Sequence, residues 1–247
     1  MRSSLATLVF LAAVPAAIQA QDYDAPRNAT VNAAGATLLK IDARAGMLRV
    51  TGRTDITEVR VKGTAHASRK GMIDDIKLEA TRNGNEVEVR VIMPDYNDRG
   101  WNNGWDDSSP VLDLVIEVPA TLPVDIEDTS GDLTVETVSA KVRIDDNSGN
   151  IRVRDTGDLT ISDNSGGIDI RGVKGSVDIV EDSSGEIEIY DVTGSVHVGR
   201  DSSGSIDVSR VGGDFVVERD GSGGIDYDDV KGKVDIPSRD RYRRGRR

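Results

Sequence analysis

The sequence predicts an all-β protein: a single-domain β-solenoid, or flattened β-helix, with two short strands in each rung of about 19 residues. Three observations lead to this fold class. The phrase Asp-x-Ser-Gly recurs six times in residues 128–236, with successive serines 17 to 19 residues apart. Apolar and polar residues alternate on both sides of each phrase, which is the period of a strand with one buried face. A second corner, Val-x-Gly, separates the two strands in the last four repeats.

Residues 1–20 have the features of a secretory signal peptide. Arg2 supplies a positive charge, residues 5–17 are a short apolar run, and small residues lead to Ala20. The run is too short for a membrane span, and no later stretch is apolar for 18 residues. The absence of cysteine excludes disulfides and a lipid-modified cysteine at the cleavage site. We therefore expect an exported protein of the bacterial periplasm or cell surface that is not a lipoprotein.

The charge of the chain argues against nucleic acid as a partner. The chain carries 31 basic and 43 acidic residues, a net charge of −12. Residues 128–236 hold 24 acidic and 11 basic residues, so the repeats contain the whole imbalance. Nucleic-acid binding needs clustered Lys and Arg, whereas an acidic surface suits divalent cations or a cationic partner.

The segment before the repeats is less regular. Residues 21–36 are polar and rich in alanine, and we expect a flexible mature N-terminus there. Residues 37–127 begin with alternating runs at 39–41, 47–50 and 58–61, which resemble one or two degenerate rungs.

A hairpin and a loop complete this N-terminal segment. Asn83-Gly84 lies between the alternating runs 76–80 and 87–91, which is a strong signal for a β-hairpin. Residues 94–110 interrupt the pattern with a polar loop that contains both tryptophans. Residues 111–118 then form a strand that ends at Pro119.

Aligning the six repeats on their serine shows which positions face inward. The third and fifth residues after the serine are apolar in every repeat, and the eighth, twelfth and fourteenth in nearly every one. Such a unit cannot bury its inner face alone, so identical units should stack about 4.8 Å apart in two parallel sheets. Proline stops sheet extension at Pro237. Residues 237–247 hold six arginines, and we expect a disordered tail.

These corners carry a resemblance to a known family. The lead-in Val118-Pro119 and Val124-Asp-Ile126, followed by repeated Ser-Gly-x-[Ile/Leu]-x-[Ile/Val] rungs, resembles the bacterial putative-adhesin β-helix family over roughly residues 37–236. The resemblance implies an exported solenoid of unknown function and, by analogy, surface attachment. It carries over no catalytic residue. The tryptophan-bearing loop and the arginine-rich tail depart from the family pattern.

The aspartates of the six phrases have two interpretations. Each carboxylate can accept backbone N–H bonds from its own Ser-Gly corner, as in an Asx turn. Alternatively, Ca²⁺ is bound between rungs, since hard cations take carboxylate oxygens. The candidate ligands are Asp128, Asp146, Asp163, Asp182, Asp201 and Asp220.

A second set of acids should face outward, four residues after the serine. We call it the outer acidic column: Asp169, Glu188, Asp207 and Asp226. It is either a solvated face that keeps a stacked sheet soluble, or a docking face for a cationic partner or metal.

The loop at 94–110 is the best candidate for ligand binding. Its Tyr96, Trp101 and Trp105 can stack on a sugar ring while polar neighbours bind hydroxyls, or they can cover an apolar end of the solenoid. The arginine-rich tail can contact anionic lipid headgroups or lipopolysaccharide phosphates.

The sequence contains no convincing catalytic group. There is no cysteine, and neither His66 nor His197 belongs to a metal or triad motif. Paired carboxylates on a β-helix can cleave polysaccharides, but regular acidic columns reflect the repeat. We therefore expect a non-enzymatic adhesin or envelope-interaction module that binds a glycan or a protein partner. The alternatives are a polysaccharide-active enzyme and a calcium-stabilised structural protein.

Overall fold

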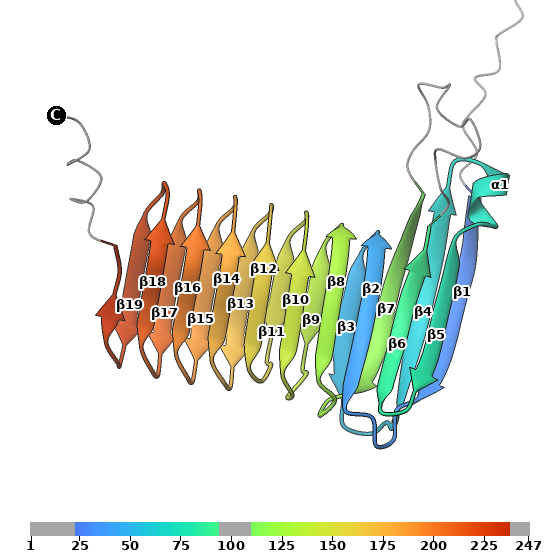
Figure 1. The fold of residues 1–247 in the computed structure, drawn as a ribbon, viewed down its shortest axis with the longest axis horizontal. Helices are drawn as coiled ribbons and strands as arrows, with labels where there is room; N and C mark the ends of the chain where they lie inside the picture. Colours follow the sequence, from blue (N-terminus) through green and yellow to red (C-terminus); the bar gives the residue numbers. More distant parts are fainter. Residues whose placement is uncertain (1–22, 94–109, 238–247) are drawn as a thin grey trace, which may run out of the picture.

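The computed structural model describes residues 23–93 and 110–237, which form a β-solenoid of two ten-stranded sheets (Figure 1). The predicted fold class is confirmed. In spatial order, sheet A contains β1 (Tyr23–Asn32), β4 (Glu58–Ala67), β7 (Val111–Pro119), β3 (Leu48–Arg53), β9 (Leu133–Glu136), β11 (Ile151–Arg154), β13 (Ile168–Val173), β15 (Ile187–Val192), β17 (Ile206–Val211) and β19 (Ile225–Val230).

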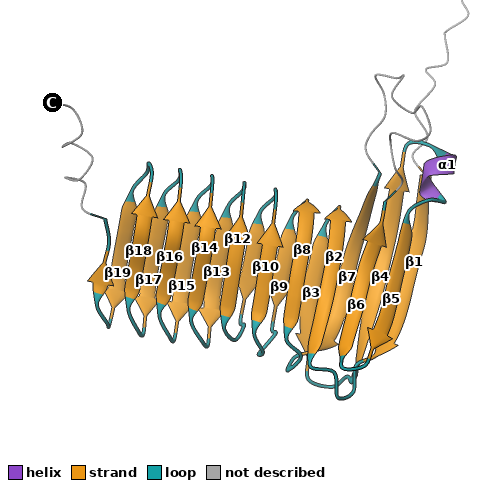
Figure 2. Cartoon of the chain, viewed as in Figure 1, coloured by secondary structure: helices purple, strands orange, loops and turns teal. Residues whose placement is uncertain are grey.

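Sheet B faces sheet A across the core, and strands make up nearly all of the regular secondary structure of the described residues (Figure 2). One short helix, α1 (Lys70–Ile73), lies at the N-terminal end of the solenoid. In spatial order, sheet B contains β5 (Lys77–Asn83), β6 (Glu86–Ile92), β2 (Leu38–Ala45), β8 (Val124–Ser130), β10 (Val142–Asp146), β12 (Leu159–Asp163), β14 (Val177–Asp182), β16 (Val196–Asp201), β18 (Phe215–Asp220) and β20 (Val234–Asp235).

The repeats stack in parallel register, as their apolar spacing predicted. Ile168 of β13 pairs with Ile187 of β15, and Ile187 pairs with Ile206 of β17. The inward side chains form one continuous core of Val, Ile and Leu that runs the length of the solenoid. Each strand buries one face and exposes the other, so outward residues also line up in columns along the solenoid.

The Asp-x-Ser-Gly corners stack glycine on glycine. The six corner glycines have φ between +123° and +143°, a region that residues with a side chain rarely adopt. A Cβ on any of them would lie 1.5–2.0 Å from the carbonyl oxygen of the equivalent glycine in the preceding rung. Only glycine therefore allows the rungs to approach closely at this corner. The glycines are Gly131, Gly149, Gly166, Gly185, Gly204 and Gly223.

The other corner also has a left-handed residue, at the seventh position after the serine. Gly172 occupies it in one repeat, with φ of +77°. The remaining five repeats place residues with side chains there, at φ between 52° and 61°. These are Thr137, Asp155, Asp191, Arg210 and Asp229. The repeat pattern alone does not predict this corner geometry, although Asp at three of the six positions tolerates it better than most residues.

The expectation of a flexible segment over residues 21–36 was wrong for Tyr23–Asn32. These residues form β1, which pairs with β4 in antiparallel register along its whole length. Small side chains such as Ala25 and Ala29 pack against the core, so the segment has a weak hydrophobic signal. The Arg27 guanidinium donates to the carbonyls of Ile73 at 2.6 Å and Ile76 at 2.8 Å, which ties β1 to the α1 region.

The N-terminal rungs follow a more complex order than simple stacking of degenerate repeats. β2 and β3 form one rung, but it lies between β6 and β7 on one side and β8 and β9 on the other. β4, which was expected to belong to a degenerate rung, pairs antiparallel with β1 and β7. The predicted hairpin is present as β5 and β6, with Gly84 at φ +62° in its turn.

We predict that Gly149→Ala destabilises the protein by more than about 3 kcal/mol, because the new Cβ would lie 1.8 Å from the Gly131 carbonyl oxygen. Urea unfolding followed by circular dichroism measures the change. Gly71→Ala is the control, since nothing lies within 4 Å of its added Cβ. Equal midpoints for the two variants would contradict the close approach of the corners.

Candidate binding surface

The outer face of sheet A presents two neighbouring columns of side chains near the C-terminal end. The outer acidic column is in register, since Asp169 pairs with Glu188, Glu188 with Asp207, and Asp207 with Asp226. Two residues further along each strand lies a second column, which runs from arginine to polar and acidic residues. Its members, in order, are Arg154, Arg171, Tyr190, Ser209 and Asp228.

Arginines neutralise the first two members of the outer acidic column. Arg154 forms an ion pair with Asp169, and Arg171 Nε donates to Asp169 Oδ1 at 3.1 Å. Arg171 Nη2 also lies 3.6 Å from Glu188 Oε2. Partial burial raises the pKa of Asp169, but the bonds and charges of Arg154 and Arg171 outweigh it and hold that pKa below its usual value. In this part of the outer face, arginines of the same face therefore neutralise the negative charges of Asp169 and Glu188.

The last two members lack such partners. Within the described chain, neither Asp207 nor Asp226 forms an ion pair with a lysine or arginine. Partial burial raises the pKa of Asp207, and the charges of Asp226 and Glu186 raise it further. Among the described residues, negative charge without a basic partner is therefore concentrated at the C-terminal rungs of sheet A.

A shallow groove of about 210 Å³ lies among these acids. Tyr227 occupies an inward position of β19, opposite Val208, and its ring packs 6.0 Å from the buried ring of Phe215, although the residue is 50% exposed. Tyr190 has the Arg171 guanidinium 5.0 Å from its ring centre, a distance typical of a cation–π contact. On the outer face, the groove combines the aromatic ring of Tyr190, carboxylates and a hydroxyl. Its lining residues are Tyr190, Asp207, Val208, Ser209, Asp226, Tyr227 and Asp228.

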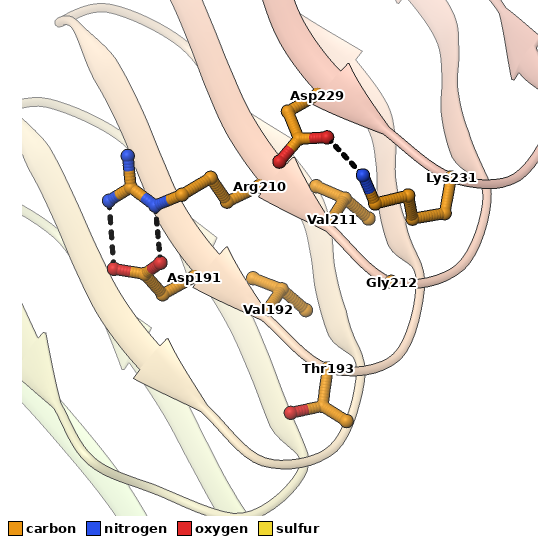
Figure 3. Close-up of a pocket in the computed structure, with 8 residues that line it drawn as sticks. All are labelled: Asp191, Val192, Thr193, Arg210, Val211, Gly212, Asp229 and Lys231. Carbon is orange, nitrogen blue, oxygen red and sulfur yellow. Dashed lines mark hydrogen bonds and ion pairs between the residues drawn. The ribbon is translucent and has the colours of Figure 1, made fainter.

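A second groove, of about 340 Å³, lies beside the Val-x-Gly corner (Figure 3). Its charges are satisfied internally. Arg210 binds Asp191 through two nitrogens, one of them at 2.8 Å, and Lys231 pairs with Asp229 (Figure 3). The hydrogen bond and charge of Arg210 lower the pKa of Asp191. With its polar groups already paired, this groove offers a ligand fewer unsatisfied contacts than the acidic one.

The six phrase aspartates, here called the inner aspartate column, point into the solenoid corner. They pair in register from Asp128 to Asp220, rung by rung. Four of them accept backbone N–H bonds from the next one or two residues, as the Asx-turn interpretation predicts. The Thr129 N–H to Asp128 Oδ1 distance, for example, is 2.8 Å.

The calcium hypothesis for this column gains no support from the geometry. Across residues 23–93 and 110–237, no three His, Cys, Asp or Glu side chains converge in a group that could hold a metal ion. The aspartates form a line along the solenoid instead of a cluster. Calcium binding stays a prediction.

Both histidines lie between acids on outer faces. His197 Nδ1 is 2.7 Å from Asp178 Oδ1, and its Nε2 is 3.1 Å from Glu218 Oε1. His66 Nδ1 is 2.7 Å from Asp24 Oδ1. These contacts are with carboxylates of the outer faces, so they give neither histidine the serine partner that a hydrolytic triad requires.

The other sequence candidates lie outside the described residues. These are Tyr96, Trp101 and Trp105 of the polar loop, the arginine-rich tail, and the signal segment. Within the described ranges, no helix is long and apolar enough to cross a membrane.

Comparison with known proteins gives limited likeness. No protein-family model matches the chain, and no curated protein matches it. A putative cell adhesion protein from Clostridium sporogenes is 12% identical, with 87% of this chain and 99% of that one covered and a TM-score of 0.33. A putative lipid binding protein from Parabacteroides distasonis is 17% identical, with coverages of 85% and 94% and a TM-score of 0.36. A putative adhesin from Bacteroides fragilis is 16% identical, with coverages of 90% and 100% and a TM-score of 0.31. With TM-scores this low, the likeness assigns no ligand.

We predict a pH-dependent effect of His197→Gln. Hydrogen bonding to Asp178 raises the pKa of His197, and Glu218 adds to this while partial burial opposes it. A raised folded pKa stabilises the fold below the unfolded value of 6.5, and this contribution is lost as the pH rises through the folded pKa. The free energy of unfolding of the variant should be about 0.5 kcal/mol lower than that of the unaltered chain at pH 5.5, and the difference should be smaller at pH 9. The effect is small because the site is largely exposed.

Thermal unfolding at the two pH values measures this effect. Asp178→Asn in the same chain serves as the second arm of a double-mutant cycle and should reduce the difference. A loss that is the same at both pH values would show that the charge of His197 is not involved.

Proposed function

We propose that this protein is an exported, non-enzymatic binding module of the bacterial cell envelope. Its ligand-binding face is the outer surface of sheet A at the C-terminal rungs. One observation carries the proposal: on this face arginines neutralise the acids in the earlier rungs, whereas the acids beside Tyr190 in the last rungs form no ion pair with a lysine or arginine of the described residues. A repeat that served only as a solvated scaffold would have no need for this change of composition.

A glycan is the ligand class that the groove favours. The ring of Tyr190, which lies in the second column of the outer face, offers an apolar surface to a sugar, as aromatic side chains with a polar tip commonly do. Asp207, Asp226 and Ser209 supply hydrogen-bonding groups for hydroxyls at fixed spacing. The rigid parallel stack holds these groups on regular structure, so little ordering is needed on binding.

Two further contacts belong to the same proposal. Tyr96, Trp101 and Trp105 add a second aromatic contact for a glycan or a protein partner. The arginine-rich tail contacts anionic lipid or lipopolysaccharide phosphates. The signal segment delivers the chain to the periplasm or the cell surface.

A polysaccharide-active enzyme is the second candidate, on a specific observation. Asp207 combines a raised pKa with a neighbouring carboxylate, Glu186, and a paired carboxylate with a raised pKa is a typical general acid. However, Asp207 keeps its place in the repeat, opposite Glu188 and Asp226. Binding without cleavage is therefore the favoured function.

We predict that Asp207→Asn and Tyr190→Ala each weaken glycan binding at least tenfold, a loss of about 1.4 kcal/mol or more, without lowering the unfolding temperature by more than a few degrees. A glycan array of envelope polysaccharides, followed by calorimetry with the best ligand, measures the effect. Trp101→Ala with Trp105→Ala tests the loop separately.

Glu181→Gln is the control, because this exposed acid lies on β14 of the other sheet. If the unaltered protein binds no glycan on the array, the glycan proposal fails. If it releases shorter saccharides and Asp207→Asn does not, the enzyme is the correct function.

A further inference from the structure

The inner aspartate column is buried along most of its length. Its first five members are at most 6% exposed, although aspartate is usually found at protein surfaces. The column begins next to Ala43, which occupies the equivalent position in β2 opposite Asp128. It continues through five successive parallel pairings to Asp220 at the C-terminal end.

Every member has a buried oxygen that accepts no hydrogen bond from the described residues. In the first four members it is Oδ2, while the Oδ1 atoms receive the backbone N–H bonds of the corner. Both carboxylate oxygens of Asp201 are buried without a hydrogen bond from the described residues, as is Oδ1 of Asp220. An ionised carboxylate that is buried with an unsatisfied oxygen is strongly disfavoured.

The charged groups that act on the column are themselves acids. Asp128 is affected by Asp146, Asp182 by Asp163 and Asp201, and Asp201 by Asp220. Asp146 is also affected by its neighbour Asp145. From the facing sheet A, each strand that follows a corner begins with an apolar core residue: Leu133, Ile151, Ile168, Ile187 and Ile206.

Burial, and then the neighbouring acids, therefore oppose ionisation. Burial raises the pKa of Asp128 and Asp182 to about 7 and that of Asp163 and Asp201 to about 6. It raises the pKa of Asp146 as well. The backbone N–H bonds of the corners act in the opposite direction but do not cancel these effects.

We propose that the inner aspartate column is a proton-binding site. Its carboxyl groups lie in one line that is buried along most of its length, each keeps a buried oxygen without a hydrogen bond from the described residues, and those residues include no three-membered group that could hold a metal ion. The buried carboxyl groups therefore stay protonated at pH values where exposed aspartates are ionised. Proton binding holds the rungs from Asp128 to Asp220 together more strongly in acid than in alkaline solution. This inference concerns the interior of the solenoid and does not depend on the proposed glycan groove.

Asparagines elsewhere in the chain show which hydrogen bond a protonated aspartate can donate. An asparagine would keep the corner bond to the backbone and would give its neighbour a donor, as stacked asparagines do elsewhere in this protein. Asn164 Nδ2 donates to Asn147 Oδ1 at 2.7 Å one rung away, and Asn150 Nδ2 donates to Asp132 Oδ1 at 3.1 Å. An aspartate at a column position can donate such a bond to the neighbouring rung only when its carboxyl group carries a proton.

The sign of the effect follows from the raised values. A group that binds its proton more tightly in the folded chain stabilises the fold below its unfolded pKa of 3.8, and this contribution is lost as the pH rises through 6 to 7. Asp169 and Asp191 have lowered pKa values and act in the opposite direction, losing their contribution below 3.8. The inner aspartate column therefore determines how stability changes with pH above 3.8, up to the raised pKa values of about 6 and 7.

The test replaces Asp182, in the middle of the column, by asparagine in the full chain. Urea unfolding of Asp182→Asn should give a higher midpoint than the unaltered chain at pH 8 and an unchanged midpoint at pH 4. Glu181→Gln removes the same charge from the adjacent, exposed position and should not raise the midpoint at pH 8. In addition, the infrared carbonyl band of protonated carboxyl groups should be present in the folded chain at pH 6 and weaker in Asp182→Asn.

Two results would overturn the proposal. Absence of the protonated-carboxyl band at pH 6 would show that the column is ionised, even if unfolding is irreversible. A midpoint that falls in Asp182→Asn at pH 8, together with a rise in the unaltered chain on adding calcium that EDTA reverses, would assign the column to a cation instead of protons.

Discussion

The close approach of backbone to backbone at the Asp-x-Ser-Gly corner is the constraint on which the rest of this structure depends. Each corner glycine lies so near the carbonyl of the equivalent glycine in the preceding rung that no side chain fits between them. This contact fixes the register of both sheets at once, because the corner joins a strand of sheet B to the next strand of sheet A. The columns of inward and outward side chains then follow from strand alternation.

Much of this architecture could be predicted from the sequence because it is local. The period of the phrase and the alternation around it are properties of neighbouring residues, and parallel stacking of near-identical units follows from them. The N-terminal part could not be predicted in the same way. β1 is held by pairing with β4, some 35 residues away, and its inward residues include small alanines with little hydrophobic signal.

The candidate sites likewise include features that the local sequence pattern predicts and features that depend on distant residues. The outward direction of Asp207 and Asp226 followed from strand period, but their lack of a cation partner depends on which residues the next column supplies. The burial of the phrase aspartates was missed, although the sequence contains the signal. Val142, Ile144 and Asp146 alternate with the same parity, so Asp146 continues the inward row into the corner. The same Asp146 side chain accepts the backbone N–H bond of the Asx turn and points inward toward the core.

The position of the β2–β3 rung has a consequence for how the chain acquires its structure. Successive repeats after residue 128 contact partners one rung away, so this part can form by adding rungs to an existing end. β3, in contrast, needs β7 and β9 as neighbours, and the first residue of β9 lies 85 residues after the first residue of β3. A chain made from its N-terminus must wait for that distant strand before this rung is enclosed on both sides. Long-range pairing of this kind is slow, so the N-terminal part of the molecule should limit the rate of folding.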